Sequence, residues 1–209
     1  MIMNNEKSEL ANGQLYVDLG LPSGLKWAKC NVGAKKETDY GDYYMWGSTI
    51  PDNNTDCSWI NTPFNNGSSD YDAVYFNSVK DDVCPNGVLA KECDAAAQIM
   101  GDDWRTPTQS DFQELIDNTN SEWIKNFNGS GVNGRKFTSK TNGNSIFIPA
   151  SGFRLDSLFR HQGSISSVWS SSLDPAYYGS AWCLYFDWDD INDGYGDRHR
   201  GRCVRGVMG

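Results

Sequence analysis

The stretch GRKFTSKTNGNSIFIPASGFR, residues 134–154, restricts the fold more than any other part of the sequence. Asn142-Gly143 lies between two runs rich in β-branched and aromatic residues, and this dipeptide is the strongest short-range signal for a β-hairpin turn. The run Ile146-Phe147-Ile148 is continuously apolar, as expected for a strand covered on both faces. The stretch therefore predicts an antiparallel hairpin whose second strand is buried.

Other short strands are predicted on either side of this hairpin. Residues 15–27 alternate apolar with polar side chains around a turn at 22–24, and residues 41–47 are an aromatic run bounded by glycines. Between them and the hairpin, residues 48–87 have the composition of a long loop held by its own aromatic side chains. Three further runs after the hairpin predict strands: SSVWSSS at 166–172, AWCLYF at 181–186 and GRCVRGV at 201–207.

A first helix is predicted in KECDAAAQIMG, residues 91–101. Ala96, Ile99 and Met100 fall on one face at helical spacing, so we expect this face to be buried. Gly101 stands where a left-handed helix terminus favours glycine.

A second helix is predicted in TPTQSDFQELIDN, residues 106–118. Thr108 is a suitable N-cap with Asp111 three residues later. The expected buried stripe is Phe112, Leu115 and Ile116. The order of strands, a helix pair and further strands predicts an α+β fold rather than a wound parallel sheet.

Composition and charge exclude several classes of protein. The chain has 209 residues, of which 13% are aromatic, so it can bury a core and is not a disordered polymer. Its formal net charge of −9 would repel a nucleic acid, which we exclude as a partner. No stretch approaches the roughly 20 apolar residues of a membrane helix, so no membrane insertion is expected. Residues 1–13 lack the pattern of a secretory signal, so the chain either stays in the cytosol or is given without its leader.

The sequence contains six cysteines and two histidines. No C-x-x-C occurs, and neither His161 nor His199 stands at zinc-finger spacing from a cysteine, so we expect no structural zinc and no other cofactor. Small buried thiols are favoured over a disulfide framework in a chain of this length. If any bridge forms, Cys183 with Cys203 is the first pair to test, because each lies in a strand-like run near the C-terminus.

Several motifs, in this order along the chain, resemble one known family. They are YVDLGLPSGLKWAKCNVGA, GDYYMWG, DDWRTPTQSDFQELI, the hairpin stretch quoted above, VWSSS, AWCLYF and GRCVRGV. Together they resemble the paralogous domain abundant in surface proteins of Bacteroides and Fibrobacter, a branch of the C-type lectin fold close to the formylglycine-generating enzymes. The resemblance covers residues from about Gln14 to Val207. It implies two helices packed on short, mostly antiparallel strands with long loops over 14–209, after a disordered or tag-like segment at 1–13.

The resemblance implies that the functional relatives of this domain are the variable proteins of diversity-generating retroelements. In those systems a reverse transcriptase miscopies template adenines, and the variable residues lie between the W-S-S strand and the terminal V-R strand. Here that interval is about 173–202. The resemblance implies a fixed frame within and around it, consisting of Trp169, Trp182, Leu184, Phe186 and Val204.

FDWDDINDGYGDRHR, residues 186–200, has three chemical interpretations. As a helix-loop-helix calcium loop it fails, because Ile191 occupies a ligand position in either register; an irregular lectin-type calcium site stays open. As a pair of catalytic carboxylates it fits poorly, since aspartates in a glycine-rich loop are usually solvated. The formylglycine-generating relatives use a close cysteine pair, whereas nineteen residues separate Cys183 from Cys203. We therefore do not expect that activity in this chain.

Recognition is the third interpretation and the one we favour. Aromatic side chains interleaved with small polar residues are typical of binding surfaces, because Tyr and Trp bury a large area at low cost in rotamer entropy. We predict a non-enzymatic protein that binds a protein or glycan ligand on a cell surface, displayed on a phage tail or a bacterial surface. A fixed-specificity adhesin or pilus-tip module is the alternative, and a formylglycine-generating type of enzyme is a weaker one. The predicted ligand-binding residues are Asp174, Tyr177, Tyr178, Ser180, Tyr185, Asp187, Trp188, Asp189, Asp190, Asp193, Tyr195, Asp197 and His199.

Overall fold

The computed structural model describes residues 8–11 and 13–209. Its first sheet brings the two ends of the chain together in the order β1-β2-β3-β13-β4. Every named strand pair in it is antiparallel, as in the other sheets of the described residues. The strands of this sheet are β1 (Ser8–Ala11), β2 (Gln14–Asp18), β3 (Lys26–Asn31), β13 (Arg205–Met208) and β4 (Trp104–Arg105).

Strand β1 corrects the prediction for the N-terminal segment. Residues 8–11 pair with residues 14–17 in a hairpin, so they are not a disordered tag. Residues 1–7 and 12, which belong to the same predicted segment, lie outside the described residues.

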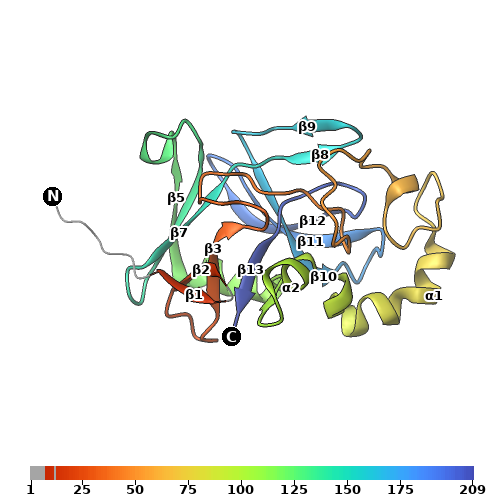
Figure 1. The fold of residues 1–209 in the computed structure, drawn as a ribbon, viewed down its shortest axis with the longest axis horizontal. Helices are drawn as coiled ribbons and strands as arrows, with labels where there is room; N and C mark the ends of the chain where they lie inside the picture. Colours follow the sequence, from red (N-terminus) through yellow and green to blue (C-terminus); the bar gives the residue numbers. More distant parts are fainter. Residues whose placement is uncertain (1–7, 12) are drawn as a thin grey trace.

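Two three-stranded sheets and a short ribbon form the rest of the β-structure. The sheet β5-β6-β7 contains the predicted hairpin: the β6–β7 pair is antiparallel, with Thr138 opposite Ser145 next to the Asn142-Gly143 turn. The sheet β10-β11-β12 crosses the middle of the molecule (Figure 1). The strands are β5 (Thr119–Ile124), β6 (Gly134–Ser139), β7 (Ser145–Pro149), β8 (Phe153–Leu155), β9 (Leu158–Arg160), β10 (Ser166–Leu173), β11 (Ser180–Phe186) and β12 (Ile191–Asp197).

The described residues form three α-helices: α1 (Ala73–Val83), α2 (Ala95–Met100) and α3 (Gln109–Asn118). Short 3₁₀ turns occur at Trp59–Asn61, Pro85–Gly87, Lys91–Cys93 and Phe127–Gly129. The fold is α+β and mostly antiparallel, as predicted, but with one helix more than expected. Among the described residues, no helix has the length and apolar character needed to cross a membrane.

Helix α3 confirms the predicted cap. The Thr108 side chain accepts the backbone N–H of Asp111 at 3.3 Å, and the Asp111 carboxylate accepts the backbone N–H of Thr108 at 2.7 Å. Phe112 and Leu115 are fully buried and Ile116 is partly buried. This capping box fixes the entry of the chain into α3.

Helix α2 differs from its prediction. It begins at Ala95 because the Asp94 carboxylate accepts the N–H groups of Ala96 and Ala97. The buried side runs through the alanines to Met100, and Ile99 is 43% exposed. The prediction that Ile99 belongs to the buried face is therefore wrong, because the helix is only six residues long and packs through its alanines.

Helix α1 lies inside the interval predicted to be loop. Its N-cap is Asp72, whose carboxylate accepts the Tyr75 N–H at 2.9 Å. Only Phe76 and Val83 are buried, which is why no apolar stripe at helical spacing marks the helix in the sequence. In Figure 1 this helix lies at the opposite end of the molecule from β5 and β7.

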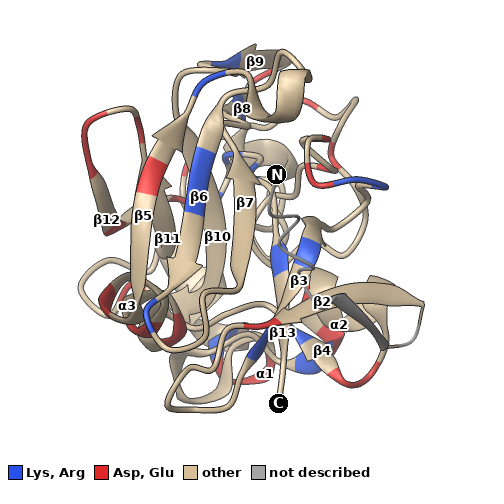
Figure 2. Cartoon of the chain, turned by 90° about the vertical axis from the view of Figure 1, so that its left-hand side faces the viewer, with Lys and Arg blue, Asp and Glu red and all other residues tan. Residues whose placement is uncertain are grey.

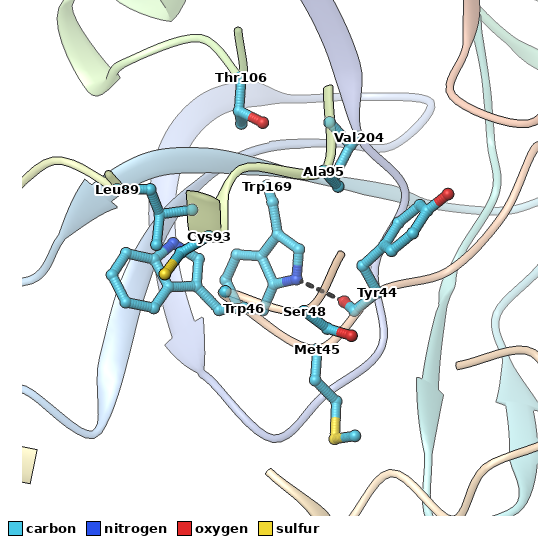
Figure 3. A pocket seen from close by; sticks show the side chains of 11 residues that line it. Tyr44, Met45, Trp46, Ser48, Leu89, Cys93, Ala95, Thr106, Trp169 and Val204 are labelled. Carbon is cyan, nitrogen blue, oxygen red and sulfur yellow. Dashed lines mark hydrogen bonds between the residues drawn. The ribbon is translucent and has the colours of Figure 1, made fainter. Parts of the chain in front are cut away.

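The core consists of two clusters on opposite faces of the β10–β11 pair. Trp169 and Cys183 pack into the cluster that also contains Trp46 and Trp104. Leu184 and Phe186 pack into the other cluster, and the Phe186 ring meets Phe137 of β6 at 6.1 Å. The interior around Trp169 is closely packed, with a residual cavity of only about 10 Å³, and its indole Nε1 donates to Tyr44 O at 2.8 Å (Figure 3). Strands β10 and β11 are thus covered on both faces and held in place.

Candidate ligand-binding face

The predicted site residues lie on or beside the β11–β12 hairpin. Strand β12 was not predicted, because the sequence there has the composition of a polar loop. It pairs with β11 along its whole length, from Ser180 opposite Asp197 to Phe186 opposite Ile191. Strand β12 is at the edge of its sheet, so one side of the hairpin is held by β10 and the other is not paired to a strand.

At the tip of the hairpin, Asp187 has a structural role. Its Oδ1 accepts the N–H groups of Asp189 and Asp190, each at 2.8 Å, and these bonds lower the pKa of the Asp187 carboxyl. The tight turn presents Trp188, which is 69% exposed, together with exposed Asp189 and Asp190. Acidic residues mark this projecting loop beside β12 in Figure 2.

At the base of the hairpin, two predicted ligand contacts are buried. Asp174 accepts the Ala176 N–H at 2.9 Å, and its own backbone N–H donates to Ser180 O at 3.2 Å. Asp174 is 6% exposed and Ser180 is 4% exposed. The two residues are therefore not presented on an outward surface, because they close the loop between β10 and β11.

The two tyrosines of the same loop differ in environment. Tyr177 is 49% exposed, with its ring edge-on to Tyr71 at 5.4 Å. Tyr178 is partly buried, 6.4 Å from the Phe76 ring and with the Lys80 ammonium 5.5 Å from its ring centre. Tyr178 therefore belongs to the packing of α1 more than to an outward surface.

Along β12 the predicted residues alternate in role. Tyr195 is 67% exposed, and its ring meets the Trp182 ring edge-on at 6.2 Å. Trp182, which was predicted to belong to the frame, is only partly buried. The Asp193 carboxylate accepts a hydrogen bond from the Gln109 side chain at the start of α3. The Asp197 carboxylate pairs with Arg200 at 3.0 Å.

The exposed predicted residues form an elongated face. Tyr177 lies at the base of the hairpin, Tyr195 in its middle and Trp188 at its tip, and seven residues of strand span about 20 Å. The structure therefore places Trp188 and Tyr195 on the hairpin and Tyr177 in the loop before it, and it does not gather the three aromatics into one cluster.

A groove of about 310 Å³ runs beside this hairpin. Of the predicted residues, Tyr185 and Tyr195 line it; the sequence interpretation missed the others. A larger depression of about 530 Å³, near Asp102 and Met208, contains none of the predicted residues. The groove is lined by Phe153, Ile165, Ser167, Cys183, Tyr185, Asn192, Gly194, Tyr195, Arg200 and Arg202.

Three arginines follow β12 at positions 198, 200 and 202, and this concentration of cations is the signal that could have pointed to the groove. The Arg198 side chain points inward, with its guanidinium 3.8 Å from the Phe76 ring centre and its Nε donating to Tyr178 O at 2.7 Å. Burial lowers its pKa to about 10. Arg200 and Arg202 line the groove.

The cysteines are all within the described part of the chain, and none is in a disulfide. The Cys203 thiol donates a hydrogen bond to Tyr40 O at 3.1 Å, and the Cys183 sulfur accepts one from the Ser167 hydroxyl at 3.4 Å. Burial raises the pKa of Cys203 to about 12, which keeps it a thiol at neutral pH. Within residues 8–11 and 13–209, no three His, Cys, Asp or Glu side chains are grouped to hold a metal ion.

His199 gives the structure a pH dependence. Its ring packs on Trp59 at 4.8 Å, and burial lowers its pKa below the ordinary 6.5. Below pH 6.5 the unfolded chain therefore binds a proton that the folded chain does not, so the free energy of unfolding falls as the pH is lowered toward the folded pKa. Urea unfolding at pH 7.5 and 5.5 measures this loss. We expect it to be smaller in His199→Gln and unchanged in the exposed control His161→Gln; an equal loss in all three proteins would contradict the assignment.

The arrangement of the face suits binding more than covalent chemistry: rigid aromatics, an amide, hydroxyls and guanidinium groups line it, and its thiols are buried. Comparison of the chain with protein-family models, with curated proteins and with solved structures finds no match.

Proposed function

We propose that this chain is a non-enzymatic ligand-binding protein with a C-type lectin type of fold, which recognises its target through the β11–β12 hairpin and the groove beside it. One observation carries the proposal. Leu184 and Phe186 of β11 are fully buried, whereas Trp188 and Tyr195 of the same hairpin are about two-thirds exposed. Binding residues are commonly presented in this way, on exposed positions of a rigid scaffold.

The fold supports the lectin-type assignment in its outline. The first and last strands of the chain lie in one sheet, two of the helices have the order expected from the family resemblance, and a long connection lies between β3 and α1. These features agree with the frame that the resemblance implies.

The separation of buried frame residues from exposed residues on the hairpin also supports diversification by a retroelement. Within 173–202, the side chains of Tyr177, Trp188 and Tyr195 contribute little to either core cluster, since none of them is among the buried residues. Substitution at such positions usually changes stability by no more than about 0.5 kcal/mol. A fixed backbone can therefore tolerate many side chains on this face while its specificity changes.

The thiols give no support to a formylglycine-generating type of enzyme. Reactive cysteines have a lowered pKa and partial exposure. Cys203 is fully buried with a raised pKa, and Cys183 is also buried. We therefore keep the non-enzymatic proposal, with display on a phage tail or bacterial surface and a protein or glycan ligand on a target cell.

Binding to an array of cell-surface glycans and proteins tests the use of the hairpin. Trp188→Ala and Tyr195→Ala are each expected to weaken binding about tenfold, since each removes a large contact of low entropic cost. Ile50→Ala is the matched control, because Ile50 is 74% exposed and belongs to the connection between β3 and α1. Binding that both hairpin variants retain in full would contradict the proposal.

The flanking DNA tests the diversification. We expect a near-copy of the segment encoding 173–202 that differs only at adenines, beside a reverse transcriptase gene. If neither is present, the chain is a fixed-specificity adhesin.

A further inference from the structure

The groove contains a guanidinium, that of Arg202, of which two nitrogens have no hydrogen-bond partner among the described residues. Arg202 is 4% exposed, and neither its Nε nor its Nη1 has a hydrogen-bond partner among the described residues. Its side chain lies over the Trp169 ring at 4.1 Å and against the backbone at Gly196, where a Cβ would collide with it. The Trp169 ring on which the guanidinium packs is itself held by its bond to Tyr44 O. A buried, unpaired polar group in a groove points to a partner that comes from outside.

The charged groups around Arg202 leave a surplus of positive charge. Asp197 is paired with Arg200 at 3.0 Å, and the Asp187 carboxylate accepts the backbone N–H groups of the hairpin tip. Cys183 is the other titratable side chain that faces Arg202. The groove of this acidic protein is therefore suited to one negative charge.

The groove also has the size and lining for a ring. Its volume of about 310 Å³ is at the lower end of ligand sites, which suits a single small ligand unit. Phe153 and Tyr185 supply aromatic surface, while Ser167 and Asn192 supply a hydroxyl and an amide. Flat aromatic surface beside several hydrogen-bonding groups suits a hydroxylated ring better than an extended peptide, which would need a longer channel.

We infer that this groove binds the carboxylate of an acidic sugar, a uronic or sialic acid, with Arg202 as the principal contact and Arg200 as the second. A hydrogen bond between a guanidinium and a carboxylate is stronger than one between neutral groups, because both partners are charged. The inference rests on the proposed function, because it names the ligand chemistry of the same face. It adds Arg202 and Arg200, which the sequence interpretation did not include.

Titration calorimetry with two matched ligands tests the inference on the unaltered protein. Glucuronic acid and its neutral amide, glucuronamide, differ only in the charged group. We expect glucuronic acid to bind at least tenfold more tightly than the amide, and added salt to weaken only the acid. N-acetylneuraminic acid and a short acidic peptide are the further arms. Equal binding of acid and amide, no binding of either sugar acid, or binding of the acidic peptide alone would each overturn the inference.

Variants locate the contact. Arg202→Gln is expected to lower the affinity for glucuronic acid at least tenfold, and Arg200→Gln several-fold. Arg160→Gln is the control, since Arg160 is an exposed arginine on β9, outside the groove. Because Arg202 is buried, its variant is first checked by circular dichroism, and Arg200→Gln, on a partly exposed side chain, gives an independent result if Arg202→Gln does not fold. The inference is overturned if Arg200→Gln binds glucuronic acid with full affinity and Arg202→Gln either does the same or does not fold.

The outcomes separate this inference from the proposed function. If hairpin variants weaken binding to a neutral or protein ligand while the arginine variants have no effect, the chain is a binding protein without a carboxylate site. If neither set of variants affects any binding, both proposals fail.

Discussion

Arg205→Met is expected to lower the free energy of unfolding by roughly 3–5 kcal/mol. Arg205 is fully buried in β13 and holds together parts of the chain that are far apart in sequence. Its guanidinium donates to Asn31 Oδ1 at 2.9 Å, to Ala28 O at 2.8 Å, to Lys29 O at 2.6 Å and to Phe147 O at 3.0 Å. It therefore links β3 to β7 through β13.

Two opposing effects decide the size of this change. Burial lowers the pKa of Arg205 to about 10, which corresponds to roughly 3 kcal/mol of unfavourable desolvation that methionine would relieve. Against this, four hydrogen bonds to a charged donor contribute about 1.5–3 kcal/mol each, and their loss leaves four acceptors without this donor. The loss exceeds the relief, so the variant is destabilised.

Urea unfolding followed by tryptophan fluorescence measures the effect, with Arg160→Met on the surface of β9 as the control. The control is expected to change the free energy of unfolding by no more than about 0.5 kcal/mol. A stability of Arg205→Met equal to that of the control would show that the four hydrogen bonds do not contribute to the frame.

Phe186→Ala is expected to cost about 3–5 kcal/mol, the usual range for a buried phenylalanine. The Phe186 ring is fully buried between Trp123 at 6.5 Å and Phe137 at 6.1 Å, so alanine leaves a cavity between two sheets. Phe186→Leu retains most of the apolar volume and should cost no more than about 1.5 kcal/mol. Equal losses in both variants would indicate that packing at this position does not depend on volume.

Features determined by neighbouring residues could be predicted from the sequence. The Asn142-Gly143 hairpin and the Thr108–Asp111 capping box depend on turn chemistry and on bonds between residues three apart, so the local sequence contains the signal. The same holds for the buried run Ile146–Ile148, whose burial follows from its continuous apolarity.

Features determined by tertiary contacts could not be predicted from the sequence. Strand β12 contains two glycines and three polar residues, and it is extended because β11 pairs with it. Helix α1 buries only two side chains, so its sequence has no clear periodicity. The run at 41–47, predicted as a strand, forms only a single bridge, from Tyr44 to Arg202.

The candidate site shows the same division. The sequence located the exposed aromatics of the hairpin, since their types are typical of binding surfaces. It did not indicate that Asp174 and Ser180 are buried, or that Arg202 packs on Trp169, because these facts depend on residues brought together from different strands.

The separation of a stable frame from a free outer face is tested most directly by comparing Phe186→Ala with Trp188→Ala, two aromatic truncations two residues apart on one hairpin. Urea unfolding should give a loss of about 3–5 kcal/mol for the first and no more than about 0.5 kcal/mol for the second. Similar losses in the two variants would contradict the account, because the exposed side chains would then be part of what holds the fold together.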